Sequence, residues 1–189
     1  EQPYVAHIPS WSGNLRFRYN LRGEDWRART VLRFDPDAVQ RIAIDYPKQR
    51  EYSFQLERRN GQMELSPFYS TTPRREGPPS AGKITSFLVA ASDLRAEAFR
   101  NNYTGKDSLL QMVPFATFQV KTREGVEQEV RLYPVFPETL GFPEAPTAAG
   151  SNREVERYFA WVLPAKDLML VQNRVFQKAL WGYPFFFEN

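Results

Sequence analysis

The chain has 189 residues, 42% of them hydrophobic and 15% aromatic, which is enough for one domain with a substantial core. Its 25 basic and 22 acidic residues leave a net charge of +3, too small for a general nucleic-acid binder. The lack of cysteine excludes disulfides, thiol catalysis and cysteine metal ligands. No apolar run reaches the roughly 18 residues that a membrane-spanning helix needs.

Aromatic and arginine side chains alternate near the start of the chain, and arginine anchors interfaces through planar hydrogen bonding and ring stacking. The sequence therefore predicts a binding surface built from Trp11, Arg16, Arg18, Arg22, Trp26, Arg27 and Arg29. An ordinary strand over residues 15–19, with Phe17 inward and its arginine neighbours outward, explains part of the same pattern. Both interpretations stay open at this point.

Strand signals follow in the first half of the chain. Residues 30–34, 42–46 and 52–58 have strand character, and Asn60-Gly61 is a hairpin turn that leads to a returning strand at 63–65. A proline-rich loop at 66–79 comes before Ser80, a helix N-cap residue. The apolar spacing after Ser80 predicts a helix over residues 81–95.

The second half repeats this order. A short helix is expected within 106–113, strands at 117–121 and 129–133, a long Pro/Gly/Ala loop at 134–152, a hairpin over 158–171 and a helix over 173–181. The sequence thus predicts an α+β fold as a single domain over residues 1–189, with an internal repeat of 38–100 and 115–185. Each repeat would be a β-rich unit of antiparallel hairpins and strands closed by one helix. The units form either two sheets or one continuous sheet with both helices on one face.

Catalytic motifs are not visible in the sequence. His7 is the only histidine, and no G-x-S-x-G elbow or phosphate-binding loop accompanies it. Of the carboxylate pairs, Asp35 and Asp37 fit a turn, and Glu127 and Glu129 fit the solvated face of a strand. We therefore predict no catalytic residue, no metal site, no cofactor and no enzymatic activity.

A family resemblance covers most of the chain. It is carried by residues 157–162 (RYFAWV), 166–172 (KDLMLVQ), Val175-Phe176, the start from Pro3 to Val31, and the strand pattern of 42–46 with Ser53-Phe54. These segments resemble an uncharacterised Bacteroidetes-type family of cell-envelope proteins known as a domain of unknown function. The resemblance implies an exported protein of the periplasm or the outer-membrane surface, and it transfers no catalytic residue.

The predicted function is a non-catalytic envelope binding or scaffolding subunit that contacts another envelope protein, with no nucleic-acid partner. The start at Glu1 without a methionine indicates either that a signal or anchor segment has been removed or that the given chain was trimmed. The resemblance implies a lipoprotein or membrane-anchored protein, which fits the first of these interpretations. The alternative is a glycan-binding or glycan-hydrolysing envelope protein that uses aromatic stacking and a carboxylate pair.

Overall fold

The computed structural model describes residues 23–136 and 155–187, apart from the side chain of Asp25. The predicted strand at 15–19 and most of the loop at 134–152 lie outside these ranges. So do four of the seven predicted binding residues, Trp11, Arg16, Arg18 and Arg22.

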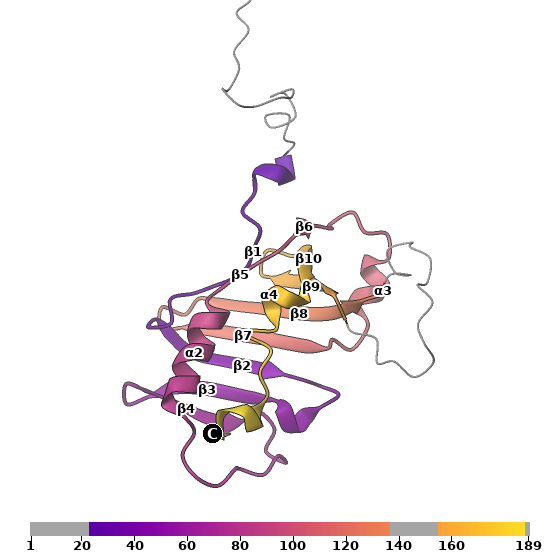
Figure 1. Ribbon diagram of the computed structural model, residues 1–189. Helices are drawn as coiled ribbons and strands as arrows, with labels where there is room; N and C mark the ends of the chain where they lie inside the picture. Colours follow the sequence, from indigo (N-terminus) through magenta and orange to yellow (C-terminus); the bar gives the residue numbers. More distant parts are fainter. Residues whose placement is uncertain (1–22, 137–154, 188–189) are drawn as a thin grey trace, which may run out of the picture.

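Ten strands and a few short helices make up the described chain (Figure 1). The strands are β1 (Thr30–Arg33), β2 (Val39–Asp45), β3 (Phe54–Arg59), β4 (Gln62–Pro67), β5 (Asp93–Arg95), β6 (Ala98–Phe99), β7 (Ala116–Thr122), β8 (Glu127–Val135), β9 (Arg157–Leu163) and β10 (Asp167–Gln172). The helices are α2 (Ala81–Ala91), α3 (Lys106–Leu110) and α4 (Asn173–Phe176), with 3-10 turns η1 (Gly23–Trp26), η2 (Arg50–Tyr52) and η4 (Tyr183–Phe187). The predicted α+β class is confirmed.

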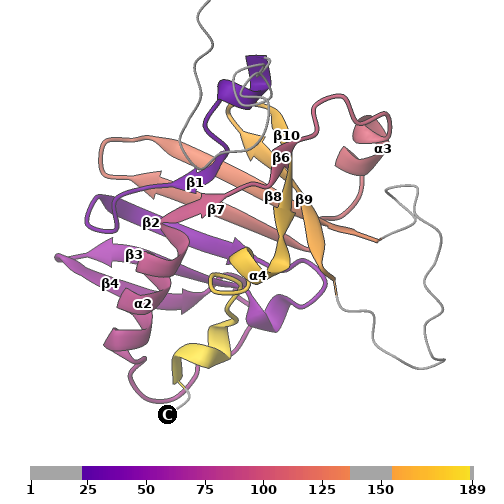
Figure 2. The same ribbon diagram turned by 45° about the horizontal axis from the view of Figure 1, so that its top comes forward.

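One antiparallel sheet of eight strands, in the order β4-β3-β2-β7-β8-β9-β10-β6, organises the fold (Figures 1 and 2). The strands of the two expected units meet at the β2–β7 pair, where Ile42 lies opposite Val120 and Ile44 opposite Phe118. The continuous sheet foreseen as one of two arrangements is therefore the one that forms. Joining the units in this way removes two sheet edges that would otherwise expose unpaired backbone groups.

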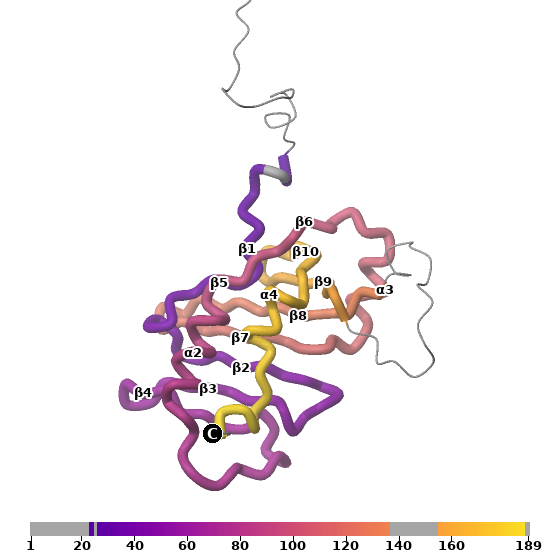
Figure 3. The backbone as a smooth tube through the Cα atoms, in the orientation of Figure 1, coloured from indigo at the N-terminus to yellow at the C-terminus, as the bar shows by residue number. Residues whose placement is uncertain are grey.

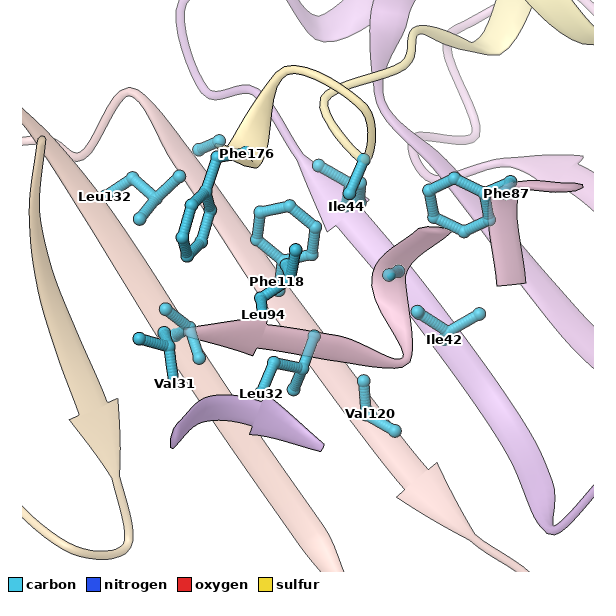
Figure 4. Packing of buried hydrophobic residues seen from close by; sticks show 14 of the residues in the cluster. Val31, Leu32, Ile42, Ile44, Phe87, Leu94, Phe118, Val120, Leu132 and Phe176 are labelled. Atoms are coloured by element: carbon cyan, nitrogen blue, oxygen red, sulfur yellow. The ribbon is translucent and has the colours of Figure 1, made fainter. Parts of the chain in front are cut away.

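The main core lies on one face of this sheet. The short β1–β5 ribbon covers the central strands there, and Figure 4 shows Leu32 and Leu94 beside Phe118 and Val120. Leu32, Leu94 and Phe118 are completely buried. Alternation along β7 sends its apolar residues to this face, as a half-buried strand requires.

Aromatic rings fix α2 and the C-terminal segment onto the same face. The Phe87 ring of α2 lies 5.2 Å from Phe54 of β3 and 5.8 Å from Phe186 of η4. The Phe54 and Phe186 rings are themselves 4.9 Å apart, and all three contacts are edge-to-face. Ser80 N–H also donates to the Phe186 carbonyl at 2.9 Å, so the start of the helix is bonded to the end of the described chain.

A smaller core lies on the reverse face under α3. Leu109 packs there with Phe159, Leu168 and Leu170, which alternate with the main-core residues along β9 and β10. Elsewhere this face is polar, with Arg41, Gln55 and other hydrophilic side chains on β2 and β3. The sheet is thus covered on both faces at one end and on one face at the other.

Two helix predictions are wrong at their C-terminal ends. Residues 92–95, expected in the helix from residue 81, leave it because Phe34 N–H bonds the Ser92 carbonyl and residues 93–95 pair with β1. The helix expected over 173–181 ends at Phe176, and residues 177–179 continue only as a turn. In the first case a strand partner about 60 residues away in sequence overrides local helix propensity.

We predict that Phe87→Ala lowers the free energy of unfolding by about 3–5 kcal/mol, because Phe87 is fully buried between β3 and the C-terminal segment. Urea denaturation followed by tryptophan fluorescence measures this change. The control is Val89→Ala on the outward side of the same helix, where the side chain is 60% exposed. It should change stability by less than about 0.5 kcal/mol, and equal effects of the two variants would contradict the packing described here.

Candidate binding site

Arg27 joins the predicted binding segment to the β9–β10 hairpin. Its two terminal nitrogens donate to the two carboxylate oxygens of Asp167, at 3.1 and 2.5 Å. The Asp167 side chain is only 8% exposed, whereas that of Arg27 is 47% exposed. The guanidinium also lies over the Phe99 ring, 4.5 Å from its centre. This forked geometry is specific to arginine and fixes the direction of the segment.

Asn101 extends the ion pair into a network. Its side-chain nitrogen donates to Asp167 at 3.0 Å and to Glu24 of η1 at 3.1 Å. Its side-chain oxygen accepts the backbone N–H of Leu168 at 2.8 Å. The network therefore connects η1, the turn after β6 and the start of β10, three places far apart in sequence.

A second ion pair lies beside the first. The Glu97 carboxylate accepts from Arg157 at 3.0 Å and from Gln172 at 3.2 Å, while Arg29 donates to the Glu97 backbone carbonyl at 2.6 Å. Arg29 thus binds the chain next to β6, and the tube in Figure 3 shows β1 running along β5. Two of the predicted binding residues, Arg27 and Arg29, therefore bond within the protein.

Both carboxylates in these pairs are held in the ionised form. Burial opposes ionisation of Asp167, but hydrogen bonds from Arg27 and Asn101 outweigh it and keep its pKa below the usual range. The hydrogen bond from Arg157 lowers the pKa of Glu97 in the same way, against the effect of burial. A general acid at neutral pH needs a raised pKa, so neither group suits proton donation.

A pocket of about 380 Å³ opens next to the network. It is lined by Glu24, Phe99, Arg100, Asn101, Asn102, Tyr103 and Phe159. Glu24 and Asp167 share the Asn101 nitrogen, so their nearest oxygens lie within about 6 Å, close to the spacing of glycosidase carboxylates. However, Asp167 already accepts three hydrogen bonds, and Phe99 and Phe159 are buried, which leaves little open ring face for a sugar.

The other candidate carboxylates have structural roles. Asp35 accepts the backbone N–H of Asp37 at 2.9 Å, which is the expected turn geometry. Glu127 pairs with Lys121 at 2.9 Å and Glu129 with Arg131 at 2.7 Å on the polar face of the sheet. Within the described ranges, no group of three or more potential metal ligands forms. Nor does that part of the chain contain a helix long and apolar enough to cross a membrane.

Trp26 is the third described member of the predicted surface. It ends η1, immediately before Arg27, and is 66% exposed. The sequence pattern does not single out Asp167 or Asn101, the residues that hold this segment in place. Asp167 follows a predicted turn, where aspartate is common for local reasons, and its arginine partner is 140 residues away in the sequence. No local pattern therefore identifies this pair.

Comparison with known proteins finds no matching family model, no matching curated protein and no matching solved structure. The resemblance to envelope proteins therefore stays a prediction.

We predict that Asp167→Asn lowers the free energy of unfolding by about 1–2 kcal/mol at pH 7, because the amide cannot replace the charge-assisted bonds. Since the folded-state pKa of Asp167 is lowered, its stabilisation is present above the unfolded carboxyl pKa of about 4 and is lost as the pH falls through the lower folded value. Urea denaturation of both proteins at pH 7 and near pH 3 should show the difference shrinking at acidic pH. A difference independent of pH would contradict an ionised Asp167.

Proposed function

We propose that this chain is a non-catalytic binding subunit of the cell envelope that contacts another envelope protein. The envelope setting, in the periplasm or at the outer-membrane surface, comes from the family resemblance alone. The non-catalytic part of the proposal is supported by Asp167, a buried carboxylate that is committed to an internal ion pair.

The observation that carries the proposal is the placement of Trp26. The Trp26 side chain is 66% exposed, and tryptophan and arginine are among the residues that most often anchor protein interfaces. Trp26 is attached to a segment that Arg27 and Asp167 hold in one position. A preorganised anchor of this kind binds with a smaller loss of conformational entropy than a mobile one.

Glycan binding is the second candidate. The observation that favours it is the pocket beside Glu24, where Tyr103 is half-buried with its ring 4.8 Å from Phe159. This role predicts that Glu24→Gln weakens binding of oligosaccharides from the cell wall, measured by calorimetry. Partner binding through Trp26 does not require Glu24 to be charged, so the variant separates the two candidates.

We expect the whole chain, used as bait on native envelope extracts, to retain a specific protein partner identified by mass spectrometry. Combined replacement of Arg16, Arg18 and Trp26 by alanine should weaken capture at least about tenfold, because such residues dominate interface energy. The control is Met112→Ala, which removes an apolar side chain of similar exposure elsewhere and should leave capture unchanged. Capture that is insensitive to the triple replacement, or the absence of any partner, would contradict the proposal.

A further inference from the structure

The loop between β4 and α2 is held firmly at both of its ends. On the β4 side, the Tyr69 hydroxyl donates to Asp45 at 2.8 Å, and the Arg50 guanidinium lies 4.8 Å from the centre of the Tyr69 ring. On the α2 side, Ser80 N–H donates to the Phe186 carbonyl at 2.9 Å. Both ends of the loop are therefore attached to the body of the protein.

The middle of this loop, residues 73–78, is an open stretch of chain that we call the loop tip. Its residues are all exposed and belong to no helix or strand. Arg75 N–H donates to the Tyr183 hydroxyl at 3.3 Å, the one hydrogen bond that joins the loop tip to another described residue. The two prolines of the tip have a restricted φ and disfavour helix in the residues before them, which keeps the stretch extended. Figure 1 shows the loop protruding below the start of α2.

Two adjacent arginines, Arg74 and Arg75, lie in the loop tip. Within the described ranges, neither side chain forms an ion pair or a hydrogen bond. Every other described lysine or arginine lies in a helix, in a strand, or in a turn or segment closed by backbone hydrogen bonds, such as Arg100 and Arg123. Among the described basic residues, this pair is thus the one that an open and extended segment presents to solvent.

Segments of this kind are the ones that proteases cleave in folded proteins. An endoprotease binds an extended stretch of chain on both sides of the bond that it cleaves, so helices, strands and tight turns must open locally first. Exposed loop tips are the preferred sites of cleavage because little has to open. Here the single bond from Arg75 to Tyr183 has to break. Proteases with a negatively charged S1 pocket select a basic residue before the cleaved bond.

We propose that Arg74-Arg75 is a cleavage site for an endoprotease with a negatively charged S1 pocket, and that the cleaved chain remains one folded molecule. In cleavage after Arg75, water adds to the Arg75 carbonyl carbon, the bond to the Glu76 nitrogen breaks, and that nitrogen takes up a proton. The products are a carboxylate on Arg75 and a new amino terminus on Glu76. Cleavage after Arg74 follows the same course one residue earlier.

The two fragments hold together through contacts away from the cut. The first fragment contributes β2, which pairs with β7 of the second fragment in the centre of the sheet. Phe87 of α2, on the second fragment, packs against Phe54 of β3 on the first. The ion pair of Arg27 with Asp167 also joins the two fragments. Cleavage therefore opens the connection between β4 and α2 without removing any part of the sheet, and it does not depend on the proposed binding function.

The test is limited digestion of the whole folded chain by trypsin at low enzyme concentration, followed by intact mass measurement and N-terminal sequencing. We expect the first cut within residues 23–136 and 155–187 to give a new amino terminus at Arg75 or Glu76. After the trypsin is inhibited, the fragments should elute together from a gel-filtration column at the volume of the uncut chain. They should separate only in denaturant.

The matched variants are two double replacements of exposed basic residues. Arg74→Gln with Arg75→Gln should slow this cut at least about tenfold, because glutamine cannot pair with the negative charge of the S1 pocket. Arg123→Gln with Lys166→Gln removes two exposed basic residues from tight turns and should leave the rate unchanged.

Four outcomes would overturn the inference. They are an earlier cut at another described lysine or arginine, an equal effect of the two double variants, separation of the fragments without denaturant, and inhibition of trypsin by the uncut chain. The last outcome would make the loop an inhibitor of such proteases instead of a substrate.

Discussion

The edge-to-face packing of Phe54, Phe87 and Phe186 holds α2 and the C-terminal segment on the apolar face of the sheet. A sheet with one apolar face must cover it, and these three rings connect a strand, a helix and the C-terminal segment in one contact. Edge-to-face rings add a directional preference to the nonspecific gain from burial. Because α2 is fixed in this way, its Ile84 and Leu88 stand at a defined place near the β4 edge.

The opposite end of the sheet is held by a hydrogen-bond network around Asp167 instead. The Asp167 carboxylate is nearly buried, and hydrogen bonds from the forked arginine and the asparagine amide compensate for its lost hydration. The two edges of the sheet therefore differ: Arg27 and Arg29 contact Phe99 and Glu97 at the β6 edge, whereas none of the described residues pairs with the outer side of β4.

Sequence periodicity predicted every long strand of the described sheet to within a few residues, because side chains alternate between faces whatever their partner strand is. Asn60-Gly61 likewise predicted its hairpin, because those residues tolerate positive φ. The helix ends were predicted less well. Leu94 continues a helical spacing, yet it lies in a strand because β1 offers its backbone hydrogen bonds. The arginine pattern predicted a binding segment around Trp26, but it could not show that Arg27 and Arg29 bond within the protein.

The sequence by itself determined the α+β class, the strands and their inward faces. These features follow from local composition and from the two-residue alternation of side chains along a strand. Only the tertiary structure decided that the two halves merge through β2 and β7, that Arg27 meets an aspartate 140 residues away, and that β4 remains at an edge. These features depend on contacts between distant segments, and their energies arise from burial and charge in the assembled molecule. Local propensity carries no information about them.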